Sequence, residues 1–443
     1  MMILKTFSLI VAVGGSILIT LPTAQPVTNN VHYPDVQEEI PVCYTEKGCV
    51  FRTLFGEESS SQGYITNTDT NIELSIDKGL AWMAAAELSN GGWGAGSHYS
   101  QGIMDPHAVS ADPATTAMVG MAFLRTGNTL QHGGYSVQLK HVLEYLLKAV
   151  ESTTDDQLKI TTETNTQIQT KLGSNIDAVL ALQFFSNIVS EMEENDPDKV
   201  RVQRCMNICA DKIQQQQDQD GSFKGSGWAG VLQSSLANNA LESAEYEGAD
   251  IDETVLERSR NYQKNNYDAS SGKVNAEKGA GVVLYAVSGS VRASAKEARK
   301  VREEVDKAVK EGKLESNEPV TAESLTKIGY SEDEAQKYST AYHVYESAKE
   351  TAQEDRVIQG FGNNGGEEFL SYLQTGESLI INQDEDWKKW YNNVSGRLIS
   401  IQNEDGSWNG HHCITSPVFC TATTLLTLSI NNDVEKLIAL GKH

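Results

Sequence analysis

Side chains that could transfer protons occur in three short segments that lie far apart in the chain. These segments are Asp105-Pro106-His107, Glu367-Glu368 and His411-His412-Cys413. Histidine titrates close to neutral pH, and a carboxyl group within hydrogen-bond reach can act as its acid–base partner. The candidate catalytic residues are therefore His411, His412, His107, Asp105, Glu367 and Glu368.

Each segment also has a simpler structural interpretation. Asp105 could accept hydrogen bonds from its own turn, and Glu367 and Glu368 could place negative charge at the start of a helix, where it is favourable. The two adjacent histidines could bond the backbone of a long loop. A catalytic site requires that the segments meet in space, whereas the simpler interpretation does not.

A second set of polar residues lies where an apolar core would reject them. Gln233, Asn238 and Asn239 fall in a predicted helix, residues 229–247, that is rich in small residues. Buried amides need hydrogen-bond partners, so we expect these three to line a wet cavity rather than to bond neighbouring helices. Asp177 and Tyr372 are expected in the same lining.

One repeated turn indicates which elements position these residues. Residues 402–408 are Gln-Asn-Glu-Asp-Gly-Ser-Trp, residues 217–223 are Gln-Asp-Gln-Asp-Gly-Ser-Phe, and residues 87–93 are Glu-Leu-Ser-Asn-Gly-Gly-Trp. An amphipathic helical run precedes each copy, and a helix of small residues follows it. Glycine supplies the positive φ of the turn, and a glutamine amide can bond nearby backbone. Such a helical pair cannot bury its apolar face alone, so recurrence predicts pairs that stack into a continuous core.

The spacing Gln-x-x-x-Gly-x-Trp resembles the QW motif of squalene and terpenoid cyclases, whose α/α toroid is shared by the protein prenyltransferase β subunits. The resemblance covers residues 79–430. It implies an all-α fold, an α/α toroid formed by a double ring of helical hairpins. In such a fold the inner helices all begin at one rim, so the three candidate segments would gather around one opening.

The chemistry of that family is not evident in the sequence. Class II terpenoid cyclases use an Asp-x-Asp-Asp run, and the nearest match here is Asp250-Ile251-Asp252-Glu253, in which Asp252 is expected to cap a helix. We therefore expect an exported cyclase-like toroid protein whose cavity-mouth site catalyses an undefined reaction. A polysaccharide lyase or hydrolase is one alternative, and it predicts an open groove with exposed aromatics. A non-catalytic binding or assembly protein is the other.

The predicted organisation has five parts. Residues 1–24 are expected to be a signal peptide, residues 25–71 an irregular arm, residues 72–292 the first part of the toroid, residues 293–351 a charged helical insertion, and residues 352–443 the closing part. The signal predicts a periplasmic or secreted protein, with a retained N-terminal anchor as the alternative. Asp112 and Pro113 are expected to be the N-cap and first residue of a helix that continues through residues 114–121. Other predicted helices span residues 77–88, 136–152, 174–195, 200–217, 229–247, 252–265, 365–373, 387–402 and 417–430, and another ends near residue 287.

The six cysteines form three close pairs, which is typical of disulfides in an oxidising compartment. Cys43 and Cys49 are expected to be bridged, as are Cys413 and Cys420. Cys205 and Cys209 share one helix face and could be bridged or simply packed. A prenyltransferase-like zinc site around Cys413 is a further possibility, but no cofactor is expected.

The net charge of the chain limits the kinds of partner that it could bind. A formal net charge of -24 argues against nucleic acid and against an anionic membrane surface, because both would repel the protein. No segment after the signal is expected to span a membrane. The expected partner is a small molecule, lipid or glycan in the central cavity.

Overall fold

The computed structural model of the chain describes residues 64, 68–154, 156–223, 227–361 and 364–442. The predicted signal peptide, most of the predicted arm, Cys43 and Cys49 lie outside these ranges. Within them, α-helices account for nearly all regular structure, and the only strands described are β1 (Tyr267–Asp268) and β2 (Lys273–Val274), which pair antiparallel. The prediction of an all-α protein is confirmed.

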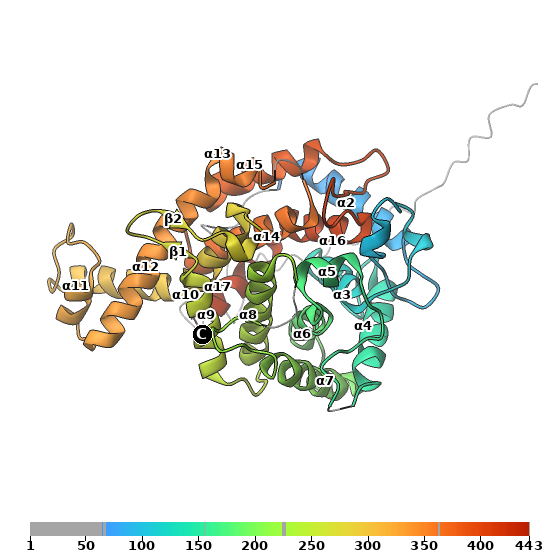
Figure 1. The fold of residues 1–443 in the computed structure, drawn as a ribbon, viewed down its shortest axis with the longest axis horizontal. Coiled ribbons are helices and arrows are strands. Elements are labelled where there is room, and N and C mark those ends of the chain that lie inside the picture. The colour runs from blue at the N-terminus through green and yellow to red at the C-terminus, as the bar shows by residue number, and fades with distance from the viewer. Residues whose placement is uncertain (1–63, 65–67, 155, 224–226, 362–363, 443) are drawn as a thin grey trace, which may run out of the picture. The chain divides into compact units, whose positions relative to one another are not determined.

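Twelve of the described helices form six consecutive pairs, each consisting of an outer and an inner helix (Figure 1). The outer helices are α2 (Thr70–Ala85), α4 (Ser136–Glu151), α7 (Pro197–Gln214), α9 (Glu253–Lys264), α12 (Glu332–Gln353) and α15 (Trp387–Ser400). The inner helices are α3 (Pro113–Arg125), α6 (Ile176–Val189), α8 (Gly230–Tyr246), α10 (Val283–Lys310), α14 (Gly366–Asn382) and α16 (Pro417–Leu428).

The inner helices contact one another in a closed cycle. Helix α3 packs on α6, α6 on α8, α8 on α10, α10 on α14, α14 on α16, and α16 returns to α3. Each outer helix packs against inner helices, as α9 does against α8 and α10. The first and last helical pairs of the chain are therefore neighbours.

Inner helices can pack on two sides because their residues are small and almost completely buried. All twelve residues of α16 are buried, and five of them are alanine or threonine. Helices α3 and α16 begin in the same way, with Asp112 or Ser416 as N-cap followed by proline at the first helical position. Proline is suited to that position because its missing N–H has no helical partner to lose.

Shorter elements complete the described chain. They are η1 (His98–Ser100), η2 (Pro106–Ala108), α5 (Gln167–Leu172), η3 (Glu277–Gly279), α11 (Ala322–Lys327), α13 (Asp355–Ile358), η4 (Ile430–Asp433) and α17 (Val434–Lys442). Helix α17 packs against α14 and α10, inside the cycle of helical pairs.

Two copies of the repeated turn bond the outer helix of the following pair. The Gln402 amide donates to Ser75 O of α2 at 2.9 Å and to Gly406 O of its own turn at 2.9 Å. The Gln217 amide likewise donates to Val255 O of α9 at 2.8 Å. The predicted contact between glutamine and backbone is confirmed, but the backbone belongs to the following pair.

The glycines of these two turns allow the next outer helix to approach closely. Gly406 has φ +95°, and a Cβ there would lie 2.7 Å from Lys78 O of α2. Gly221 has φ +88°, and a Cβ there would lie 2.2 Å from Arg258 O of α9. Both glycines therefore provide a positive φ and the room for the next outer helix to approach.

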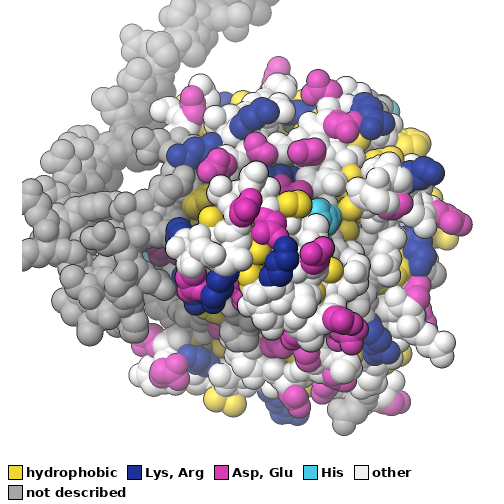
Figure 2. Space-filling view, turned by 90° about the vertical axis from the view of Figure 1, so that its left-hand side faces the viewer, with side chains coloured by type: hydrophobic (Ala, Val, Ile, Leu, Met, Phe, Trp, Pro, Cys, Tyr) yellow, Lys and Arg dark blue, Asp and Glu magenta, His cyan; other side chains and the backbone are white. Residues whose placement is uncertain are grey.

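The expected insertion at residues 293–351 needs narrower limits. Helix α10 continues without a break from the inner cycle to Lys310, well past the predicted end near Val287. Ala295 and Ala298 of α10 and Tyr345 of α12 belong to the main core. A small separate core contains Val301, Leu325 and Ala335. The part that projects from the other helices is therefore the far half of α10, α11 and the first half of α12 (Figure 1). Acidic and basic side chains are mixed over this side of the molecule (Figure 2).

Candidate functional site

The starts of the inner helices are bonded to one another, which defines an N-terminal rim. The carboxylate of Asp177 in α6 accepts from Ala114 N of α3 at 3.2 Å, and the amide of Gln233 in α8 donates to Asn175 Oδ1, the residue before α6. Burial raises the pKa of Asp177. Asp177 and Gln233 were expected to line the cavity, but they instead join adjacent helix starts.

Glu367 and Glu368 lie at this rim, in the first turn of α14, and both are fully buried. Glu368 Oε1 accepts from the hydroxyl of Tyr285 in α10 at 2.8 Å and from Phe361 N at 3.0 Å. Glu367 Oε2 accepts from Ile414 N at 3.3 Å. Burial and the neighbouring Glu368 raise the pKa of Glu367 to about 8, so the Glu367 carboxyl is predominantly neutral at pH 7.

The predicted meeting of His412 with the two glutamates is observed. His412 Nε2 lies 4.0 Å from Glu368 Oε1, and its ring centroid lies 5.1 Å from that of Phe361. The rings of His411 and His412 are 6.2 Å apart, and His411 is exposed. Residues separated by about 45 positions in the sequence thus form one acid–base cluster.

Asp105 and His107 do not join this cluster in the described contacts. The Asp105 carboxylate accepts from His107 N at 2.9 Å and pairs with His107 Nδ1 at 3.5 Å, and both side chains are more than half exposed. Asp105 caps η2, so the simpler interpretation holds. The residue that links this loop to the cluster is Gln101, whose amide donates to Cys413 O at 2.8 Å.

Two more of the expected lining residues have other partners. Tyr372 is buried and donates its hydroxyl to Ile358 O at 2.6 Å, and burial raises its pKa to about 12. Asn238 is buried beside Glu242, to which its side chain is hydrogen-bonded. Neither residue lines the central cavity described below, and of the predicted set only Asn239 does so.

The expected bridge between Cys413 and Cys420 is absent, because both are free thiols. Burial raises the pKa of Cys413 to about 12, and Cys420 donates its thiol to Ile414 O at 3.5 Å. Cys205 and Cys209 are also free and buried, which favours packed core cysteines over a bridge. In the described ranges, no group of three or more His, Cys, Asp and Glu side chains could hold a metal ion.

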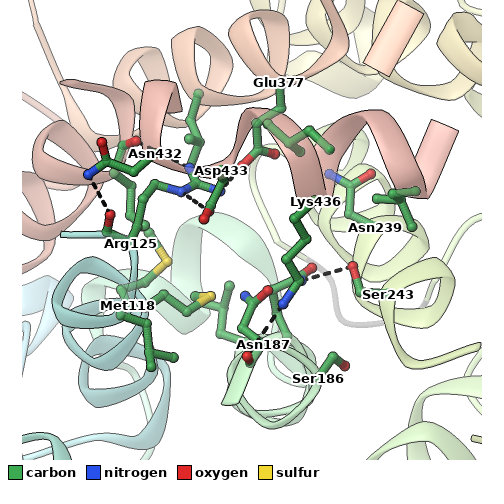
Figure 3. Close-up of a pocket in the computed structure, with 18 of the residues that line it drawn as sticks. Met118, Arg125, Ser186, Asn187, Asn239, Ser243, Glu377, Asn432, Asp433 and Lys436 are labelled. Atoms are coloured by element: carbon green, nitrogen blue, oxygen red, sulfur yellow. Dashed lines mark hydrogen bonds and ion pairs between the residues drawn. The ribbon is translucent and has the colours of Figure 1, made fainter. Parts of the chain in front are cut away.

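A central cavity lies at the opposite ends of the inner helices. Its volume is about 280 Å³. Its walls come mainly from the second halves of α3, α6, α8 and α14, and from α16 and α17 (Figure 3). The site was expected at the mouth of a cavity where the inner helices begin, whereas this cavity lies at their other ends. The acid–base cluster and the cavity occupy different rims.

The cavity wall combines apolar and polar side chains. Its apolar side chains are those of Met118, Met121, Leu124, Leu180, Leu236, Leu370, Leu373, Leu426, Leu437 and Leu440. At its edge, Arg125 Nη2 lies 2.6 Å from Glu377 Oε1 and its Nε lies 2.5 Å from Asp433 Oδ2, so this arginine is fully paired (Figure 3).

Three buried side chains of the wall carry polar atoms without a hydrogen-bond partner. These atoms are Gln374 Nε2, Asn239 Oδ1, and Nε and Nη1 of Arg292. The other ends of two of them are held, since Gln374 Oε1 accepts from Ser235 Oγ at 3.0 Å and Arg292 Nη2 lies 3.0 Å from Glu242 Oε2. Unpartnered buried donors are costly, so a ligand that accepts their hydrogen bonds would be favoured.

The surroundings of Arg292 are positively charged. Burial tends to raise the pKa of Glu242, but Arg292, Lys296 and Arg260 outweigh it and hold the pKa at about 2. Arg260 also has a second carboxylate partner, since its Nη2 lies 2.6 Å from Glu253 Oε1. Arg292 lines the cavity, and its Nε and Nη1 have no hydrogen-bond partner.

Arg292 and Gln374 were not among the residues predicted from the sequence. Asn239 was predicted because it is a polar residue in a helix of small residues. Gln374 shows the same pattern, since it lies between Leu373 and Thr375 of the buried helix α14. Arg292 follows a similar stretch, Ser288-Gly289-Ser290, but it lay next to the expected insertion.

No protein-family model, curated protein or solved structure matches this chain. No described helix has the length and apolar character needed to cross a membrane.

Proposed function

We propose that this protein binds a small amphipathic molecule in its central cavity, with an apolar body against the leucines and methionines and an acceptor-rich head group at Arg292 and Gln374. The supporting observation is the set of unpartnered buried polar atoms beside the leucines and methionines of the cavity wall. Three of the four atoms are donors, so the complementary head is a carboxylate or a similar oxygen acceptor. The volume is close to the lower end of the ~300–1,000 Å³ typical of ligand pockets, which favours a small ligand.

This proposal includes the fold assignment. The closed cycle of six inner helices and the glutamine contacts of the repeated turn support an α/α toroid of the terpenoid cyclase and prenyltransferase kind. The function proposed from the cavity is binding. The cluster of Glu367, Glu368 and His412, which was the candidate for catalysis, lies at the other rim and does not line this cavity.

The test is displacement of a fluorescent anionic amphiphile, 8-anilinonaphthalene-1-sulfonate, by decanoate and by decanol. Decanoate should compete about tenfold better than decanol, the ratio expected for one charge-assisted contact of ~1.4 kcal/mol. The variant Leu373→Trp, which fills the cavity, should lose probe and decanoate binding together. A matched variant on the exposed side of α7, Val200→Trp, should bind as the original protein does.

Equal competition by the acid and the alcohol would contradict the proposed head-group contacts. Unchanged binding in a folded Leu373→Trp variant would place the probe elsewhere and contradict the proposed function itself.

A further inference from the structure

A chain of alternating charges connects the exposed side of the outer helix α9 to the wall of the central cavity. It begins at Glu253 of α9, whose Oε1 lies 2.6 Å from Arg260 Nη2 of the same helix. Arg260 Nη1 lies 3.4 Å from Glu242 Oε1 of the inner helix α8. Glu242 Oε2 in turn lies 3.0 Å from Arg292 Nη2 of the inner helix α10. Arg292 lines the cavity, so the chain of charges ends there.

Only the first member of this chain of charges is in contact with bulk water. The side chain of Glu253 is 65% exposed, that of Arg260 11%, and those of Arg292 and Glu242 3% and 1%. Buried charges are costly unless they are paired, and each buried member of the chain has an opposite charge beside it. Arg292 has such a neighbour on one side, whereas its Nε and Nη1 have no hydrogen-bond partner.

The contacts along this chain of charges compete with one another. Glu242 lies between two arginines, and Arg260 lies between two carboxylates. A carboxylate that is drawn more strongly to Arg260 neutralises Arg292 less. The positive charge that Arg292 offers to the cavity therefore depends on a glutamate at the outer surface, through two intervening side chains.

We propose that Glu253 and Arg260 are specificity-determining residues of the central cavity, because through Glu242 they set how strongly Arg292 attracts an anionic head group. This inference rests on the binding function proposed above and concerns which ligands the cavity prefers. Neutralising Glu253 leaves Arg260 to Glu242 alone, so Arg292 is less neutralised and the preference for acids increases. Neutralising Arg260 leaves Glu242 to Arg292, so the preference for acids decreases. Changes at two adjacent residues thus have opposite effects on the same ligand.

The experiment measures displacement of 8-anilinonaphthalene-1-sulfonate from the full chain by decanoate and by decanol. Glu253→Gln should raise the affinity for decanoate roughly threefold and Arg260→Gln should lower it roughly threefold, the magnitude typical of one partly exposed charge pair. The affinity for decanol should stay the same in both variants, because an alcohol carries no charge. The probe is itself an anion, so its own dissociation constant is measured for each variant and used to convert displacement into affinity.

Two variants of the same helix serve as controls. Glu257 lies one turn after Glu253, and its Oε1 pairs with Lys337 Nζ at 2.7 Å, outside the chain of charges. Glu257→Gln should therefore leave the ratio of decanoate to decanol affinity unchanged. Glu253→Asp keeps the charge and should behave as the original protein does. A merely structural role of Glu253 or Arg260 would change the affinities for both ligands together and leave their ratio constant.

Three results would overturn this inference while decanoate still binds the original protein: a constant ratio in Glu253→Gln, a shift of the ratio in the same direction in Glu253→Gln and Arg260→Gln, or an equal shift in Glu257→Gln. Glu253 is exposed, so its variants test the inference even if Arg260→Gln does not fold. Failure of decanoate to bind the original protein is a different result, which would contradict the proposed function and this inference together.

Discussion

The amide of Gln374 provides a sensitive test of the proposed ligand site, because its two ends have opposite effects on stability. Its Oε1 accepts from Ser235 Oγ at 3.0 Å, whereas its Nε2 is buried without a partner. A hydrogen bond contributes roughly 1 kcal/mol, and an unsatisfied buried donor costs roughly 1–3 kcal/mol. Replacing both partners in the double variant Ser235→Ala/Gln374→Leu removes the bond and the unsatisfied donor together.

We expect the free energy of unfolding of the ligand-free double variant to stay equal or to rise by up to about 2 kcal/mol. The affinity for decanoate should nevertheless fall by about tenfold, since the acid loses one donor worth ~1 kcal/mol or slightly more. Urea denaturation measures the first quantity, and probe displacement measures the second. The single variant Ser235→Ala is the control, because it removes the internal bond and keeps the donor.

A less stable double variant with unchanged decanoate affinity would refute this reasoning. It would mean that Gln374 Nε2 contributes to the fold and not to a ligand.

Two further predictions concern the rim and the projecting helices. Burial and Glu368 raise the pKa of Glu367 from 4.5 to about 8, so its stabilising contribution is complete below pH 4.5 and is lost as the pH rises through 8. In Glu367→Gln, the unfolding free energy should fall by a few kcal/mol less between pH 4.5 and pH 8 than in the original protein. Urea titrations at several pH values measure this difference. An unchanged slope of unfolding free energy against pH would contradict the raised pKa. Replacing residues 305–334 by a short Gly/Ser linker should leave one cooperative thermal transition in circular dichroism, because these residues pack mainly in the small separate core. Loss of cooperativity would show that the projection supports the main core.

The sequence was sufficient to predict the helical class, the starts of α4, α15 and α16, and the position of the repeated turn. Glycine, proline and capping residues act locally, so the neighbouring residues alone identify Asp112 and Asp252 as N-caps. The meeting of His412 with Glu367 and Glu368 also followed from the repeat, because consecutive inner helices must begin at the same rim.

The parts that were not predicted depend on contacts between distant segments. Whether Asp177 lines a cavity or bonds Ala114 of α3 depends on how closely two helix starts approach, which no local pattern encodes. Tyr372 was assigned to the cavity for its chemistry, but its direction is set by the position of Ile358 on another element. The end of the cycle at which the cavity opens is likewise decided by α17, whose short amphipathic sequence gives no indication of where it packs.

The closure of the helical cycle has a consequence for the order of synthesis. The amide of Gln402 bonds Ser75, and α16 packs against α3, so the first helical pair meets its second neighbour only when the last forty or so residues have been made. Until then the faces of α2 and α3 that α16 covers remain open to solvent or to a chaperone. The contact between the last helical pair and the first is of the same kind as the contact that the repeated turn makes elsewhere. The cycle of helical pairs therefore has no first or last member, although the chain does. A chain that began at a different helical pair would form the same contacts between pairs. The only difference would be which pair is synthesised first and therefore lacks its second neighbour until synthesis ends.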